Sequence, residues 1–299
     1  DVSRVPEYPF APLFRATASM NPSFRFDDVD ILVNRNSLRK LLDFSAGRRQ
    51  DNFRVNLHLV HQTLVIERCE RTARELISGS KSSGWGRNFE RMFTAYPPGL
   101  KESTAHHRAL RYQLGDLSCV VRFEVDACYE QMGGSSGPKS LEGAMGRLAV
   151  EDGPGGAAAP QPPTQPPMAQ ATAAEIKTAT KPKSPSAYMP QLWFGRTPWL
   201  IIGQHAKGTF EKLKITDTAA LFTSWEESHQ ADLRKLITVL ARLREAVREN
   251  GSSHCVAIYE KTAESASIKV YPSSIVKKAL PDDLGRMLWD SWSSGPPAP

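Results

Sequence analysis

A stretch rich in Gly, Pro, Ala and Ser, residues 131–172, divides the sequence into two parts that carry ordinary core-forming patterns. The stretch contains no aromatic residue and no hydrophobic period, so burial cannot offset the entropy lost on ordering it. We therefore expect a disordered insertion. The fold must then be assembled as one domain from residues 1–130 and 173–291, with a flexible tail over 292–299.

Composition narrows the class of protein without naming it. Apolar residues make up 40% and charged residues 23%, which is typical of globular domains. No apolar run approaches the roughly 18 residues that a membrane span needs, so we expect no membrane partner. The formal charge of +6 is compatible with a nucleic-acid partner but is weak support for one. Four scattered cysteines without metal-site spacing predict free thiols in a reducing, intracellular compartment.

Hydrophobic periodicity predicts a mixed α/β fold. Residues 53–60 alternate strictly between apolar and polar side chains, and residues 63–68 read as the hairpin partner of that strand. Residues 233–247 repeat apolar side chains at helical spacing. Further helices are expected at 34–44, 69–78 and 86–95, and further strands at 117–128, 173–178, 199–203, 208–215, 254–260 and 266–271.

Two acidic residues occupy the predicted strand at 117–128. Glu124 and Asp126 lie two apart and should share a face, opposite Val121, Phe123 and Val125, which should pack into the core. Carboxylates about 6–7 Å apart on a strand can converge on one cation or straddle a pair of them. A solvated polar face is the usual reason for a single pair of this kind, so the pair alone does not establish a site.

A second pair follows the insertion, in the segment AAEIKT. Glu175 and Lys177 share one face of a predicted strand. A carboxylate can hold a metal ion there, and the ammonium group can orient an attacking water or steady a phosphate oxygen. Oxygen ligands favour magnesium or manganese over zinc.

The ordered series NRNSLRKLL, GWGRNFE, RFEVDA, AEIKT and QLWFGRTPWLIIG, over residues 34–203, resembles the motifs of the DXO-type RNA decapping nucleases. No single motif is diagnostic; their order carries the resemblance. It implies a core like that of the PD-(D/E)XK nucleases, with a mixed sheet flanked by helices. Arg87 departs from the family pattern, which has an aromatic residue at this place, so the chain looks like a divergent member.

The resemblance also implies roles for particular residues. Glu90, Glu124, Asp126 and Glu175 would hold two divalent cations, Mg or Mn. Lys177 and Gln191 would position the scissile phosphate and the water, and Arg35 would contact an RNA phosphate. The implied activity is metal-dependent hydrolysis at RNA 5′ ends: decapping, pyrophosphate removal or NAD-cap removal, with 5′→3′ exonuclease activity in some members.

Each of these residues has a simpler explanation. Arg35 could be a surface charge at a helix start, Glu90 a partner for a neighbouring arginine, and Gln191 a cap. His106 and His107 fit a surface loop. Of Trp85, Trp193 and Trp199, which could stack on bases, we expect at least two to pack in the core.

Alternatives for the function also stay open. The chain could be a non-catalytic protein that binds RNA or stabilises a 5′→3′ exoribonuclease partner with the same fold, or a DNA nuclease on the same core. RNA over DNA rests on the resemblance alone. Both the nucleus and the cytoplasm suit such a protein.

Overall fold

The computed structural model describes residues 7–48, 51–70, 84–96, 103, 105–130, 169–181, 183–261, 266–275 and 277–290. The chain forms two compact units, and each is built from segments that are far apart in sequence. Unit 1 comprises residues 1–80, 108–123 and 226–299, and unit 2 comprises residues 81–107 and 124–225.

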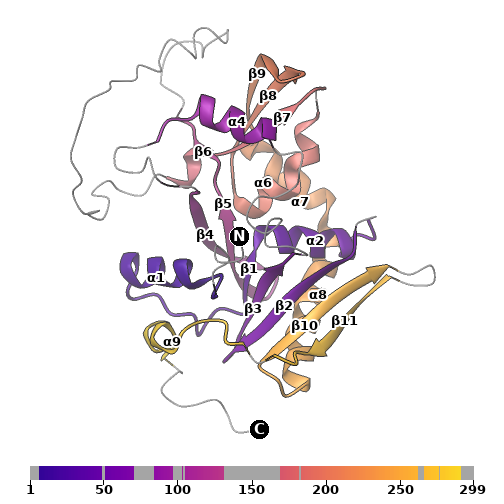
Figure 1. The fold of residues 1–299 in the computed structure, drawn as a ribbon. Helices are drawn as coiled ribbons and strands as arrows, with labels where there is room; N and C mark the ends of the chain where they lie inside the picture. The colour runs from indigo at the N-terminus through magenta and orange to yellow at the C-terminus, as the bar shows by residue number, and fades with distance from the viewer. Residues whose placement is uncertain are drawn as a thin grey trace. The chain divides into compact units, whose positions relative to one another are not determined.

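Unit 1 is built on a seven-stranded mixed sheet (Figure 1), in the order β11-β10-β2-β3-β1-β5-β4. Strand β1 pairs in parallel with β3 and β5, whereas β2 pairs antiparallel with β3 and β10, and β10 antiparallel with β11. The strands are β1 (Ile31–Asn34), β2 (Phe53–Val60), β3 (Thr63–Cys69), β4 (His107–Leu114), β5 (Leu117–Glu124), β10 (His254–Lys261) and β11 (Ala266–Pro272).

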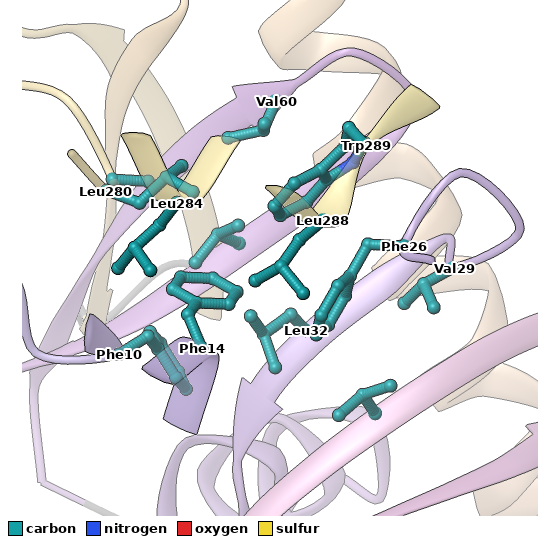
Figure 2. Close-up of a cluster of buried hydrophobic side chains, with 13 residues drawn as sticks. Phe10, Phe14, Phe26, Val29, Leu32, Val60, Leu280, Leu284, Leu288 and Trp289 are labelled. Carbon is teal, nitrogen blue, oxygen red and sulfur yellow. The ribbon is translucent and has the colours of Figure 1, made fainter. Parts of the chain in front are cut away.

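Helices α1 (Ala11–Met20) and α9 (Asp282–Leu288) contact each other over one face of this sheet. Figure 2 shows the cluster of buried side chains there, in which aromatic rings from α1 meet the segment around α9. Phe14 packs edge-on against Trp289, with 5.7 Å between ring centroids, and Phe26 stacks on the same indole at 4.9 Å. Burial of these apolar side chains stabilises this face and ties the C-terminal helix to β1, β3 and β5.

Helices α2 (Arg35–Ser45) and α8 (Gln230–Glu249) pack on each other and against strands of the same sheet. Leu32 of β1 belongs to the buried cluster under α1 and α9. Ile31 and Val33, which point to the opposite side of β1, are also buried, so both faces of this strand are covered. The apolar positions of α8 that repeat at helical spacing are buried, as the periodicity predicts: Leu233, Leu236, Leu240, Leu243 and Val247.

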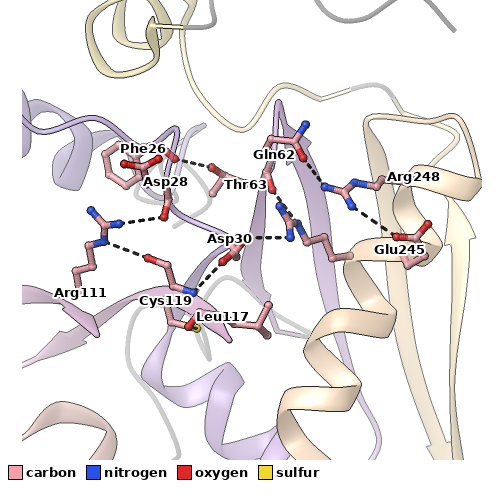
Figure 3. Close-up of polar contacts among 12 residues, drawn as sticks. Phe26, Asp28, Asp30, Gln62, Thr63, Arg111, Leu117, Cys119, Glu245 and Arg248 are labelled. Atoms are coloured by element: carbon pink, nitrogen blue, oxygen red, sulfur yellow. Dashed lines mark hydrogen bonds and ion pairs between the residues drawn. The ribbon is translucent and has the colours of Figure 1, made fainter. Parts of the chain in front are cut away.

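Polar contacts fix the entry into β1 (Figure 3). Asp30 accepts a hydrogen bond of 2.8 Å from the backbone N–H of Ser118 and pairs with Arg244 of α8 at 2.9 Å. Arg244 also donates to the carbonyl of Gln62, in the turn between β2 and β3. One carboxylate therefore links β5, β1 and the long helix α8.

Unit 2 holds a four-stranded sheet in the order β6-β7-β8-β9. Its strands are β6 (Ala127–Cys128), β7 (Ala173–Ala179), β8 (Trp199–Ala206) and β9 (Thr209–Asp217). β7 runs parallel to β8 and antiparallel to β6. The α-helices of its described residues are α4 (Gly84–Phe93), α6 (Met189–Gly195) and the first residues of α7 (Phe222–Ser228), whose end belongs to unit 1. Unit 2 also contains the short 3-10 helices η2 (Gln170–Thr172), η3 (Pro185–Tyr188) and η4 (Ala219–Leu221).

The predicted fold class, mixed sheets flanked by helices, is confirmed. The predicted continuous strand at 117–128 is wrong. β5 ends at Glu124, and the backbone N–H of Val125 donates to the carbonyl of His106, so the chain leaves one sheet before β6 joins the other. Val121, Phe123 and Val125 are buried as expected.

Other expectations are met in part. Cys69, the first residue of the helix expected at 69–78, ends β3, and residues 71–78 lie outside the described part of the chain. Residues 131–168 of the expected insertion also lie outside it, whereas its last residues form η2. His106 and His107 are exposed, but His107 begins β4 and does not belong to a loop.

The four cysteines are free thiols, as expected. In the described part of the chain, no helix is long and apolar enough to span a membrane.

Candidate functional site

Six of the seven candidate side chains belong to unit 2. Arg35 is the exception, because it begins α2 in unit 1. The six come from helices α4 and α6, from the end of β5 and the segment that follows it, and from β7: Glu90, Glu124, Asp126, Glu175, Lys177 and Gln191. Residues separated by as many as 101 positions are thus brought into one compact unit.

The buried carboxylate of Glu175 is the centre of this group. Its residue is only 1% exposed, although it is an acid in a strand. One oxygen, Oε1, accepts hydrogen bonds from Lys177 Nζ on the same strand and from Gln191 Nε2 of α6. A charged carboxylate is stable in such a place only when charge-assisted bonds compensate for its lost hydration. The predicted Glu175–Lys177 pair therefore exists, and Gln191 joins it.

Asp126 lies against the edge of the same strand. Its Oδ2 accepts a hydrogen bond of 2.8 Å from the backbone N–H of Ile176 and lies 3.9 Å from Lys177 Nζ. The next residue, Ala127, pairs with Ala174 in the antiparallel ladder between β6 and β7. The short strand β6 thus fixes the aspartate next to β7.

Helix α4 supplies Glu90, and close packing on β8 holds that helix in place. Phe89 is fully buried, and a Cβ atom at Gly203 would lie only 2.7 Å from its Cζ and 2.8 Å from its Cδ2. The ring also stacks on Phe93 at 4.2 Å and packs on Phe210 at 4.6 Å, measured between centroids. The absence of a side chain at Gly203 therefore leaves room for α4 to pack on β8, and Glu90 directly follows Phe89 in that helix.

Electrostatics show that these acids act on one another. The pKa of Glu90 is raised, first because burial removes water from the carboxyl and then because Glu124 is negative nearby. The pKa of Asp126 is raised well above its usual value by burial and by the charge of Glu175. Lys177 lowers both pKa values and only partly offsets the repulsion.

The donor set fits a hard divalent cation in its chemistry, because every candidate ligand is a carboxylate and the acids repel one another. Among the described residues, however, no group of three or more His, Cys, Asp or Glu side chains is gathered closely enough to hold a metal ion. Lys177 supplies the positive charge between Glu175 and Asp126. The carboxylates would therefore have to move toward a cation as it binds.

Arg35 is not the surface charge that a helix start would suggest. It is 8% exposed, and its guanidinium lies 5.3 Å from the ring centroid of Phe123 within unit 1. Two other basic residues of the same unit also have structural contacts: Lys40 pairs with Glu70 at 3.1 Å, and Arg122 donates to the carbonyl of Pro9. The proposed contact of Arg35 with an RNA phosphate stays a prediction.

The expectation that at least two of the three tryptophans pack in the core is met in part, because Trp199 is only half-buried. Trp193 is buried, and Trp199 packs on Tyr129 and donates its indole N–H to the carbonyl of Ala171. Trp85, in contrast, is 47% exposed. Sequence reasoning missed the packing roles of Phe89 and Gly203, although a glycine inside an apolar strand is a known sign of close approach by another element.

Solved structures share the fold. Rai1 from Scheffersomyces stipitis matches with a TM-score of 0.55 and 13% identity, covering 97% of this chain and 82% of the other. Rai1 from Candida albicans, solved in complex with pU5-Mn2+, matches with a TM-score of 0.53 and 12% identity over 95% of this chain and 80% of the other. Rai1 from S. pombe matches with a TM-score of 0.54 and 12% identity over 83% and 73%.

At this identity the likeness shows the fold, a divergent version of the one seen in these Rai1 structures. No curated protein matches the sequence. Residues 1–289 match the family model described as "Domain of unknown function (DUF8563)". The chain therefore belongs to this family.

Proposed function

We propose that the chain is a metal-dependent hydrolase of RNA 5′ ends, acting on phosphodiester or pyrophosphate linkages in 5′-end quality control. The observation that carries the proposal is the buried Glu175 carboxylate, bonded to Lys177 and Gln191 and close to Asp126. One buried carboxylate, two partly buried acids with raised pKa values and a neighbouring lysine are together costly for stability and typical of sites that bind ions or substrate.

Glu90, Glu124, Asp126 and Glu175 are the proposed ligands of two divalent cations, magnesium or manganese. Such cations, when bound, activate water and neutralise charge on the phosphate. The presence of manganese with pU5 in the Candida albicans Rai1 structure, and of calcium with (3'-NADP)+ in that of S. stipitis Rai1, supports this choice of ion and substrate.

Lys177 and Gln191 are the proposed positioning groups. Both bind one oxygen of Glu175, so their donors are directed to a single point beside the acids. An ammonium and an amide N–H in that place can donate to a phosphate oxygen or orient a water. In the reaction, water adds to phosphorus, the bond from phosphorus to the leaving oxygen breaks, and the leaving group takes up a proton.

The proposal is tested with RNAs that carry a 5′-triphosphate, 5′-monophosphate, guanosine cap or NAD cap, in manganese, magnesium or EDTA. We expect release of pyrophosphate, a cap fragment or nucleotides in metal only. Glu175→Gln and Glu124→Gln should each lower turnover by about 100-fold or more. Glu211, an exposed acid of β9, offers a matched control, because Glu211→Gln removes the same charge away from the group.

Equal activity in EDTA, or in the Glu175→Gln variant, would refute the proposal. RNA binding without hydrolysis would favour the non-catalytic protein that binds RNA or stabilises an exoribonuclease. The order of rates among the four RNAs identifies the preferred 5′ end.

A further inference from the structure

Trp85 lies in the first turn of α4, five residues before Glu90, and 47% of its surface is exposed. Three other described tryptophans, Trp193, Trp225 and Trp289, are each less than a tenth exposed, and Trp199 is half-buried. The apolar face of α4 does not need Trp85 for its packing, since Phe89 and Phe93 already contact Phe210. An indole with an open face beside a group of functional candidates is available to a ligand, because its ring can stack while its N–H bonds.

The indole is supported from one side by the turn between β8 and β9. A Cβ atom at Gly208 would overlap Cζ3 and Cη2 of the indole and lie 3.0 Å from Cε3, so the benzo ring rests on the glycine backbone. Gly208 has φ +97° and Lys207 has φ +49°, so the turn is tight. The ring of His205, which is buried, lies 5.8 Å from the indole. Trp85 is therefore held in place while much of its surface stays open.

Positive charge accompanies the open indole. Lys207 of the supporting turn is exposed, and Arg87 is exposed two residues after Trp85. Along α4, Trp85 and Glu90 are separated by about 7.5 Å at the helical rise, on the order of two stacked nucleotides. An aromatic face flanked by cations beside a hydrolytic site is the arrangement that binds single-stranded nucleic acid through its bases and phosphates.

We propose that Trp85 is a stacking platform for a base of single-stranded RNA close to the 5′ end, with Lys207 and Arg87 as phosphate contacts. The inference rests on the proposed function, because it places the platform next to the reacting phosphate. It makes single-stranded RNA the substrate class. A paired 5′ end presents no free base to the indole and should bind less well.

The test measures binding and hydrolysis separately. Fluorescence anisotropy with a 3′-labelled, 5′-monophosphorylated five-nucleotide RNA in calcium reports affinity, and manganese-supported hydrolysis reports KM and kcat. Trp85→Ala should weaken binding by about 5- to 150-fold, the loss of one base stack, and Trp85→Phe should recover most of it. Met92→Ala is the matched control, because Met92 is a 61% exposed apolar residue of the same helix.

A second set of RNAs, each lacking the base at one position, identifies the contact. For the wild-type protein, one position should lose affinity by a similar factor, and the same RNA should lose little further affinity with Trp85→Ala. Unfolding curves of the variants show whether α4 remains folded. Trp85→Phe keeps an aromatic ring but lacks the indole atoms that meet Gly208, so recovered affinity in this variant indicates stacking and not helix placement.

Unchanged affinity and KM in Trp85→Ala would refute the stacking platform without refuting the metal-dependent hydrolase. The exposed face of Trp85 would then be a candidate contact for a protein partner. Equal losses from base removal in wild type and variant would overturn it as well. Trp85-dependent binding without hydrolysis by the wild-type protein would support the platform and refute the proposed hydrolase.

Discussion

Gly203→Ala should destabilise unit 2 and disturb the site without changing any candidate ligand. The added methyl carbon would lie 2.7 Å from Cζ and 2.8 Å from Cδ2 of Phe89, which is closer than carbon atoms approach in folded proteins. Phe89 cannot turn aside easily, because Phe93 and Phe210 pack on it. Relief therefore requires α4 to move away from β8, and Glu90 moves with it.

Overpacking of this kind costs about 1–3 kcal/mol of unfolding free energy. Urea unfolding followed by circular dichroism measures the loss, and the apparent manganese affinity in the hydrolysis assay reports the displacement of Glu90. Gly86→Ala is a matched control on α4, since nothing lies within 4 Å of its Cβ position. Alanine in a helix should stabilise the protein by up to about 1 kcal/mol.

Replacing Phe89 with a smaller side chain should compensate for the methyl group added at position 203. Gly203→Ala combined with Phe89→Leu removes the colliding ring atoms, so the double variant should lose less stability than the sum of the two single variants. Wild-type stability and manganese affinity in Gly203→Ala would refute the idea that this contact places Glu90. Additive losses in the double variant would show that the two residues act independently.

Three further predictions follow from burial and charge. Burial raises the pKa of the Cys119 thiol to about 12, so it should resist alkylation at pH 8 in the folded protein, whereas the partly exposed Cys69 should react. Burial and the charge of Glu175 raise the folded-state pKa of Asp126 well above 3.8, so the ionised form is disfavoured in the folded protein and stability falls as pH rises above 3.8. Asp126→Asn should therefore make the metal-free protein more stable than the wild type at pH 8, with the gain shrinking toward pH 4 in urea unfolding. The folded-state pKa of His254 is lowered below 6.5 mainly by burial, so stability should fall as pH drops from 7 to 5, and the fall should be smaller in His254→Asn.

The sequence predicted which residues share a strand face better than it predicted where the strands end. Two-residue spacing correctly placed Glu175 and Lys177 on one side of a strand, and the apolar positions before Glu124 correctly predicted a strand with a buried face. The same periodicity could not show that β5 ends at Glu124. That break depends on a hydrogen bond from Val125 to His106, a contact that no local pattern encodes.

Burial of polar groups was also beyond the sequence. Arg35 at a helix start and Glu175 in a strand both follow patterns that are usually exposed, yet both are buried. Only the folded units show the partners of these groups, Phe123 for the arginine in unit 1 and Gln191 for the glutamate in unit 2. Helices α1 and α9 were not predicted either. Neither has a clear helical repeat of apolar residues, and each buries its apolar side chains against the other helix.

Manganese binding measured by calorimetry tests the central claim most directly, with wild-type protein, Glu175→Gln and Glu211→Gln compared in buffers of different ionisation enthalpy. We expect the wild type and Glu211→Gln to bind manganese and to release protons on binding, because burial and mutual repulsion raise the pKa values of Asp126 and Glu90 and a bound cation opposes that rise. Glu175→Gln should bind at least tenfold more weakly, a loss typical of a missing ligand or ligand support. Absence of binding in the wild type, or equal binding in Glu175→Gln, would contradict a metal site built on these carboxylates.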